Sequence, residues 1–178
     1  MQDDAMKSLL ESHANKFFGK YRGLVTDNRD PLFRGRLKIQ VPQVLGETEV
    51  WAMPCVPYAG KDVGFFALPK TGTIAWIEFE AGDPSYPIWT GCTWALGDIS
   101  AADAIPEVKF IKTDKFTLRI DDTIGEVTIE NQGGSQIVVG PLEIKIKSAS
   151  VSSEATGGRK TELTAVSFAV NDAGLEVL

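Results

Sequence analysis

Between Tyr21 and Trp94, short apolar runs of strand length alternate with clusters of Gly, Pro, Asp and Asn. Leu37, Ile39 and Val41 are separated by charged or amide residues, the period of two expected of a strand with one buried and one solvated face. Turn-forming residues precede this run at 30–35 and recur at 69–72. The pattern predicts an all-β domain with about five strands, most simply a small closed barrel.

The segment from Thr73 to Phe79 has apolar residues on both faces of its predicted strand. Ile74 and Trp76 lie on one side, whereas Ala75 and its alternate neighbours lie on the other. One face can fill the interior of a small barrel, so the other needs a partner, either another part of the chain or another copy of it. The residues predicted to lie in the barrel core or between subunits are Ile74, Trp76, Ile77, Phe79 and Trp89.

Beyond Pro106 the chain becomes a series of very short alternating segments separated by polar turns, with few aromatic residues. Each apolar row has only two or three members, too few to close a core around one chain. Three copies wrapped around a common axis would bury such rows inside a triangular β-prism. The predicted trimer interface comprises Phe116, Leu118, Ile120, Val127, Ile129, Ile137, Val139, Leu142, Ile144, Ile146, Val166, Phe168 and Val170.

Two further segments complete the predicted organisation. Residues 1–19 have apolar side chains at three- and four-residue steps, which predicts an amphipathic helix ending at Gly19, with the only histidine, His13, on its apolar face. That face can pack on the barrel or dock onto another protein. Residues 95–106 are rich in Ala, Gly, Asp, Ser and Pro, which is typical of a linker. The predicted domains are therefore a helix (1–19), a barrel (20–94), a linker (95–106) and a β-prism (107–178).

The barrel region resembles a known family through several motifs in a fixed order, among them DNRDP, GRLKIQVP, WAMPCVPYAG, GFFALPKTGT and WIEFEAGDPSYPIW. It is similar to the oligonucleotide/oligosaccharide-binding-type (OB) domain of central spike proteins, the baseplate assembly protein V family. Those proteins lie on the axis of contractile phage tails, of the type VI secretion valine-glycine repeat spike and of extracellular injection particles. For the region beyond Pro106, the resemblance implies an intertwined triple-stranded β-helix.

The resemblance implies a function as well as a fold. It implies a homotrimeric, non-enzymatic spike that is carried by a baseplate hub protein and pierces the target cell envelope when the sheath contracts. The resemblance implies a pointed tip, which in some longer members holds a histidine-bound metal. No histidine lies near Leu178, so we expect a separate tip-capping protein. We expect no cofactor, no metal site and no catalytic residue, because the chain contains no Ser-His-Asp set, no His-rich cluster and no phosphate-binding loop.

Charge bears on the main alternative, a monomeric OB module that binds nucleic acid or polysaccharide. The formal net charge is −6, which argues against general nucleic-acid binding because phosphate affinity comes from clustered Lys and Arg. One basic cluster could nevertheless form a groove for an anionic ligand, although acidic residues are interspersed with it. Its members are Arg22, Arg29, Arg34, Arg36 and Lys38.

Cys55 and Cys92 lie on predicted strands, and we expect buried free thiols in preference to a disulfide. No apolar run approaches the roughly 18 residues of a transmembrane helix. The acidic start MQDD is unlike a signal peptide. We therefore expect a protein that is made in the cytoplasm and assembled into a virion tail or another contractile particle.

Overall fold

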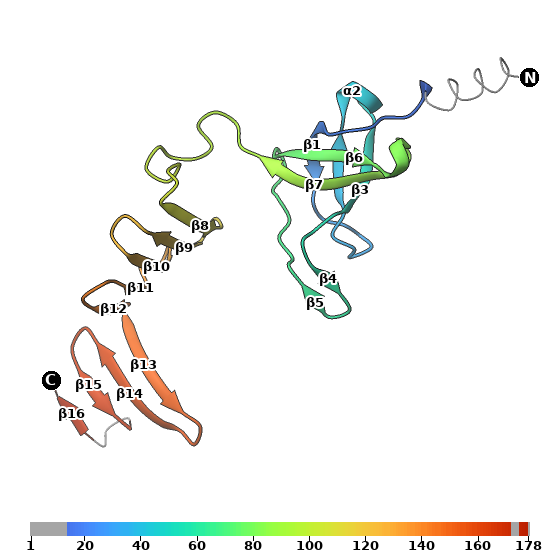
Figure 1. Cartoon of the computed structure of the whole chain (residues 1–178). Helices are drawn as coiled ribbons and strands as arrows, with labels where there is room; N and C mark the ends of the chain where they lie inside the picture. The colour runs from blue at the N-terminus through green and yellow to red at the C-terminus, as the bar shows by residue number, and fades with distance from the viewer. Residues whose placement is uncertain (1–13, 172–174, 178) are drawn as a thin grey trace, which may run out of the picture. The chain divides into compact units, whose positions relative to one another are not determined.

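The structure is a computed structural model that describes residues 14–171 and 175–177 of the chain. The chain divides into two compact units between Asp98 and Ile99. Both units consist mainly of β-strands, as the sequence predicts (Figure 1).

The first unit is a closed five-stranded barrel with the strand order β1-β2-β3-β7-β6. Neighbouring strands are antiparallel except β3 and β7, which pair in parallel through Met53 and Ile88 and so close the barrel. This confirms the predicted small barrel. Its strands are β1 (Tyr21–Asp27), β2 (Leu37–Gln40), β3 (Glu49–Pro54), β6 (Ile74–Phe79) and β7 (Pro87–Thr93).

Three short elements connect the barrel strands. A single helical turn, α2 (Pro42–Leu45), lies between β2 and β3. A two-stranded ribbon, β4 (Ala59–Gly60) and β5 (Val63–Gly64), stands out from the barrel between β3 and β6 (Figure 1). A 3-10 turn, η1 (Glu80–Gly82), joins β6 to β7.

The barrel core is made by alternate residues of the strands, and β6 is the clearest example. Its inward residues Ala75, Ile77 and Phe79 are buried, whereas Ile74 and Trp76 lie on the outer face and are only half-buried. Of the predicted core-or-interface set, Ile77, Phe79 and Trp89 therefore lie in the core. The full core is Val25, Leu37, Ile39, Val41, Ala52, Ala75, Ile77, Phe79 and Trp89.

The predicted N-terminal helix over residues 1–19 lies mostly outside the described residues, and so does His13. Within the described part, Ala14 is helical, whereas residues 16–18 are in neither a helix nor a strand, so the helix does not reach Gly19. The Phe17 amide donates a hydrogen bond to the Gly82 carbonyl (2.8 Å), and its ring packs near Tyr21 and Phe79. The chain is therefore tied to the barrel before β1 begins.

The second unit contains two antiparallel sheets in which consecutive strands pair. The five-stranded sheet is formed by β8 (Val108–Lys112), β9 (Phe116–Asp121), β10 (Glu126–Asn131), β11 (Gln136–Val139) and β12 (Ile144–Lys147). The four-stranded sheet is formed by β13 (Ser150–Ala155), β14 (Arg159–Thr164), β15 (Phe168–Val170) and β16 (Leu175–Val177). All of this pairing is within one chain, so the interchain pairing of an intertwined β-helix stays a prediction.

Candidate interaction surface

The strand register of the five-stranded sheet gathers its aliphatic side chains on one face. Cross-strand partners share a face, and one row runs from Leu118 to Ile129 to Ile137 across the three central strands. A second row, two residues away along each strand, contains Ile120, Val127, Val139 and Ile144. We call this surface the apolar face; its residues are Ile111, Leu118, Ile120, Val127, Ile129, Ile137, Val139, Ile144 and Ile146.

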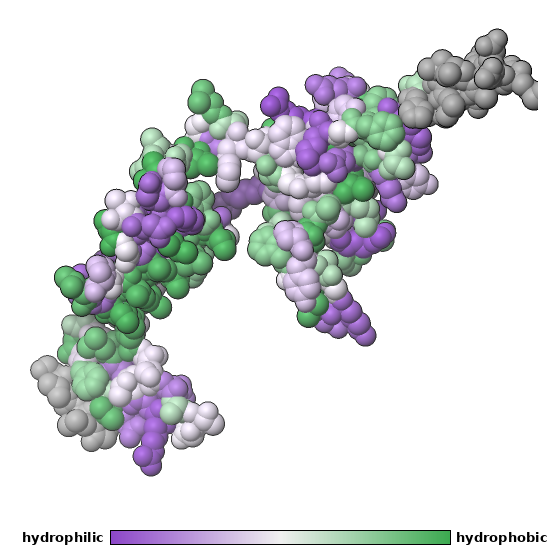
Figure 2. All heavy atoms as spheres, viewed as in Figure 1, coloured by the Kyte–Doolittle hydropathy of each residue, from purple (hydrophilic) through white to green (hydrophobic). Residues whose placement is uncertain are grey.

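The apolar face is largely open to water. Ile144 is 69% exposed and Ile111 62%, and even the members on β10 are only half-buried. Hydrophobic residues are visible over this sheet in Figure 2. Nine aliphatic residues on one face form a contiguous surface that monomeric proteins seldom leave uncovered.

The opposite face of the sheet, which we call the polar face, is mainly polar. Its central row contains Phe110, Arg119, Thr128, Val138 and Lys145, and the next contains Thr117, Glu130 and their partners. The sheet therefore has one mainly polar face and one apolar face, as in sheets that pack against a second layer.

The remaining predicted interface residues lie close to this pattern. Phe116 is two residues before Leu118 on β9, and Leu142, 97% exposed, lies in the turn before β12. In the four-stranded sheet, Phe168 pairs with Leu163, Val170 pairs with Thr161, and Val166 lies in the preceding turn.

Sequence reasoning missed several apolar residues that the register adds. Ile111 extends the first row of the apolar face onto β8. Val151 and Leu163 are partners that continue the row of Phe168 in the four-stranded sheet. Alternation gives no signal for Ile111, because the alternating apolar pair in VKFIK is Val108 and Phe110, which lie on the opposite face. Strands β13 and β14 contain too few apolar residues to be predicted.

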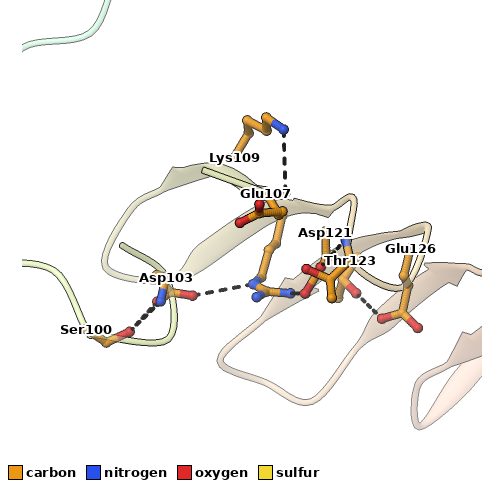
Figure 3. A network of polar contacts seen from close by, with 9 residues as sticks. Ser100, Asp103, Glu107, Lys109, Asp121, Thr123 and Glu126 are labelled. Carbon is orange, nitrogen blue, oxygen red and sulfur yellow. Dashed lines mark hydrogen bonds and ion pairs between the residues drawn. The ribbon is translucent and has the colours of Figure 1, made fainter. Parts of the chain in front are cut away.

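A network of ion pairs ties the start of the second unit to the polar face of the sheet (Figure 3). The Arg119 guanidinium bonds the carboxylates of Asp121 (2.8 Å) and Asp103 (3.4 Å), and Asp103 also accepts a hydrogen bond from the Ser100 hydroxyl (2.8 Å). The Arg119 side chain holds the pKa of Asp121 below its usual range. The Ser100 hydroxyl and then Arg119 lower the pKa of Asp103. Lys109, the one charged residue in the apolar rows, is paired with Asp122.

Three of the five residues of the basic cluster, Arg22, Arg36 and Lys38, make contacts within the barrel itself. Arg36 forms a salt bridge with the buried carboxylate of Asp30 (2.7 Å), and this contact holds the pKa of Asp30 well below its usual range. Lys38 pairs with Glu49 (2.7 Å) and lowers its pKa. The Arg22 guanidinium lies over the Trp76 ring at 5.4 Å, and Arg36 also lies over Trp51 at 5.2 Å.

Among residues 14–171 and 175–177, Arg29 and Arg34 are the two of the five basic residues whose side chains make neither an ion pair, a hydrogen bond nor an aromatic contact. Two arginines do not make the clustered positive surface that phosphate backbones require. This arrangement counts against the nucleic-acid alternative.

The structure corrects the expectation of buried thiols. Cys55 and Cys92 are free and exposed. Cys55 comes directly after β3, where the chain leaves the barrel, and Cys92 lies beyond the irregularity in the β6–β7 pairing. Strand membership alone does not decide burial, because a register shift turns the residues beyond it to a different face.

Within residues 14–171 and 175–177, no group of three or more His, Cys, Asp or Glu side chains is arranged to hold a metal ion. No helix in the described part of the chain has the length and apolar character needed to span a membrane.

Comparison with known proteins gives the barrel a family. The type VI secretion system/phage-baseplate injector OB domain family matches residues 21–94, the range from the start of β1 to just beyond β7. The chain is 28% identical over 107 residues to the actin cross-linking toxin VgrG1 of Vibrio cholerae serotype O1, which covers 57% of this chain and 10% of that protein. It is 29% identical over 114 residues to the type VI secretion system spike protein VgrG3 of the same species, which covers 59% of this chain and 11% of that protein.

The chain thus spans about a tenth of the length of these curated relatives. The matched family and the closed five-stranded barrel agree on the fold of the first unit. Residues 21–94 thus match the OB domain of phage-baseplate and type VI secretion injectors, and the chain is similar over somewhat more than half its length to two VgrG proteins.

Proposed function

We propose that this chain is the non-enzymatic central spike of a contractile tail or injection particle, and that it works as a homotrimer. The observation that carries the proposal is the uncovered apolar face of the five-stranded sheet, with nine aliphatic residues in cross-strand register. Three such faces packed around a common axis would bury one another and leave the polar faces in water.

Function follows from the mechanical properties of that assembly. A spike transmits axial force from the baseplate to the target envelope, so its subunits must not slide or peel apart. A dry interior shared by three chains resists sliding, because any shift exposes aliphatic surface to water. The network of Arg119, Asp103 and Asp121 would help fix the start of the spike.

Partners follow from the same proposal. A baseplate hub protein would carry the spike at the barrel end, and a small tip-capping protein would cover its far end. Contact with the target envelope would be transient, and the finished spike would be found in the virion tail or contractile particle.

The native mass of the full-length chain, measured by light scattering on a sizing column, tests the proposal. A second sample that ends at Ala104 retains the barrel but lacks both sheets of the second unit. We expect a trimer for the full chain and a clear loss of trimer for the truncated one. A monomeric full-length chain at micromolar concentration would refute the proposed spike.

A further inference from the structure

The β4–β5 ribbon is a two-stranded sheet whose outer edges are unpaired. Its strands pair with each other and with no other strand of residues 14–171 and 175–177. One further backbone hydrogen bond, from the Phe65 amide to the Tyr58 carbonyl (2.9 Å), also lies within the ribbon. A ribbon of two strands is marginally stable in water, and Gly60 and Gly64 weaken this one. Its free edges are therefore a template for a third strand.

The ribbon borders an apolar groove. The groove has a volume of about 310 Å³ and lies between the ribbon, the loop before β2 and the end of β3. The ribbon stands away from the barrel (Figure 1), and Val63, Phe65 and Phe66, which line the groove, are more than half exposed. Other lining residues are Gly35, Pro54, Val56, Tyr58, Leu68 and Trp89. A concave surface with this lining can hold apolar side chains.

The loop before β2 adds positive charge to one side of the groove. Arg34 lines the groove and Arg29 is in the same loop, and among the described residues neither side chain makes an ion pair, a hydrogen bond or an aromatic contact. The other two charged residues of residues 28–36 pair with each other. At the ribbon tip, Lys61 and Asp62 have opposite charges. The groove is thus beside two uncompensated positive charges, in a chain whose net charge is −6.

The same loop is a preorganised wall. The buried Asp30 carboxylate accepts hydrogen bonds from the amides of Leu32 (2.9 Å) and Arg34 (2.8 Å). Between them, Phe33 lines the groove, is 94% exposed and has a φ of +54°, a left-handed conformation that bulky residues rarely adopt. Strained residues of this kind concentrate at functional sites. A ligand that meets a wall already fixed in this way has less ordering entropy to overcome.

We propose that an extended segment of another protein binds here as a third strand of the ribbon, with alternate apolar side chains in the groove and a carboxylate beside Arg34. Strand addition takes its affinity from main-chain hydrogen bonds and its specificity from pockets for alternate side chains. The positive loop selects an acidic segment over a basic one. Every residue involved is in the barrel unit, so the inference does not depend on the proposed trimer.

Another protein fits this surface better than a second copy of the chain does. The barrel is closed, so within residues 21–94 the free strand edges are those of the ribbon. Two barrels could therefore pair strands only ribbon to ribbon, a two-fold contact that would place like charges of both loops about one axis. The edge strands β8 and β12 of the five-stranded sheet contain lysines, which Arg34 would repel.

A displayed library of linear twelve-residue peptides, selected on the full-length chain, tests the preference for such a segment. We expect enriched sequences in which apolar residues alternate and in which Asp or Glu accompanies them. A parallel selection on the Arg34→Glu variant should lose this acidic preference. No enrichment, enrichment of basic sequences, or the same sequences from both selections would overturn the inference.

Backbone methylation of the best enriched peptide, made synthetically, tests strand addition itself. In an extended strand, alternate amides point to the same side. Methylation of one alternate set therefore removes the donors that face the ribbon, and methylation of the other set leaves them. By fluorescence anisotropy we expect one set to weaken binding by about tenfold or more and the other to change it little. Equal effects of the two sets would mean that the peptide does not add as a strand.

Substitutions on the protein locate the site. Phe66→Ala and Arg34→Glu each change an exposed lining residue, so we expect about tenfold or weaker peptide binding at a nearly unchanged unfolding temperature. Trp94→Ala and Lys147→Glu are the matched controls, because Trp94 is an exposed aromatic residue outside the groove and Lys147 is on the polar face of the other unit. Equal losses in the controls would place the peptide elsewhere and contradict the inference.

Hydrogen exchange separates the possible occupants. We expect amides 58–66 to exchange fast in the full-length chain alone and slowly once the peptide is bound. If they already exchange slowly in a trimer and become fast in a monomeric Ile144→Asp variant, a second copy covers the ribbon, so this inference is wrong and the spike trimer stands. A monomeric full-length chain that binds the peptide refutes the trimer and supports this inference.

Discussion

Ile144→Asp tests whether the apolar face is the trimer contact. Ile144 is on β12, at the edge of the sheet, and is 69% exposed in the single chain. The substitution therefore removes little packing from the monomer. In the proposed trimer it would bring three carboxylates to a dry interior, where a charge without a partner is strongly disfavoured.

The expected loss of trimer stability follows from the area of Ile144 that trimer formation would bury. Full burial of an isoleucine side chain is worth about 1.5–3 kcal/mol, so covering the exposed 69% of Ile144 is worth roughly 1–2 kcal/mol per copy. Three copies give roughly 3–6 kcal/mol per trimer, which weakens association by about 10²–10⁴-fold. Desolvation of the carboxylates adds to this loss.

Native mass measured over a dilution series gives the dissociation midpoint, and far-UV circular dichroism checks that the strands remain. Lys147→Asp is the matched control, because Lys147 is on the same strand but in register with Gln136 on the polar face. It changes the net charge by more than Ile144→Asp does, so an effect of net charge alone would appear more strongly in the control. If Ile144→Asp dissociates at the same concentration as the wild type, the apolar face is not the contact.

Three further predictions concern the fold itself. Gly23→Ala places a Cβ 2.7 Å from Cγ1 of the buried Ile77, so we expect chemical denaturation to show a loss of about 1–3 kcal/mol. Arg119→Gln breaks two ion pairs at the turn that begins the second unit, so hydrogen exchange at the Ala104 amide should accelerate while the barrel is unaffected. Asp30→Asn should lower the unfolding temperature of the barrel at pH 7 by several degrees. The pKa of Asp30 in the folded state lies below its ordinary value of 3.8, so the ionised carboxylate stabilises the fold fully at pH values well above 3.8. This stabilisation is lost as the pH falls below 3.8. The Asp30→Asn variant lacks it at every pH and should therefore lose stability less steeply in acid than the wild type.

Each of these predictions has a control. Gly140→Ala meets only an ordinary contact (3.6 Å) and should be nearly neutral, and equal losses at both glycines would contradict the packing argument. Lys147→Gln removes a charge from the same polar face as Arg119, on the other edge strand, and should leave exchange in the turn unchanged. Asp27→Asn removes a carboxylate that accepts one backbone amide, so a change as large as that of Asp30→Asn would show that the buried network has no special role.

The barrel could be predicted from the sequence because its turns are chemically explicit. Asp30 and Gly35 bracket the loop before β2, and Gly72, with a φ of +87°, ends the turn before β6. Period-two alternation then assigned the inward residues of β2 correctly. What the sequence did not reveal was the ribbon, because the Ala-Gly-Lys-Asp-Val-Gly run has too few strand-forming residues to distinguish it from a loop.

The prediction for the two cysteines failed for a related reason. Cysteine is a residue type that favours the interior, as aromatic residues are, yet both thiols are exposed, as are Phe66 (77%) and Trp94 (69%). Local pattern reports which residues share a face, but it does not report whether a given face meets the core, the solvent or another chain. For the second unit, period two identified most of the apolar face, whereas the strand pairing needed the structure.

The edges of the five-stranded sheet explain why association would occur through its face. An unpaired edge is a template for uncontrolled strand addition, and natural sheets limit this with lysines on their edge strands. The edge strand β12 contains Lys145 and Lys147, and β8 contains Lys109 and Lys112. Strand addition at either edge would bring these charges together from neighbouring copies, while leaving the aliphatic rows in water. Packing of three faces removes those rows from water and keeps Lys112, Lys145 and Lys147 on the polar face, while Lys109, in the apolar rows, stays paired with Asp122. The charge pattern therefore favours a closed assembly over an open fibre.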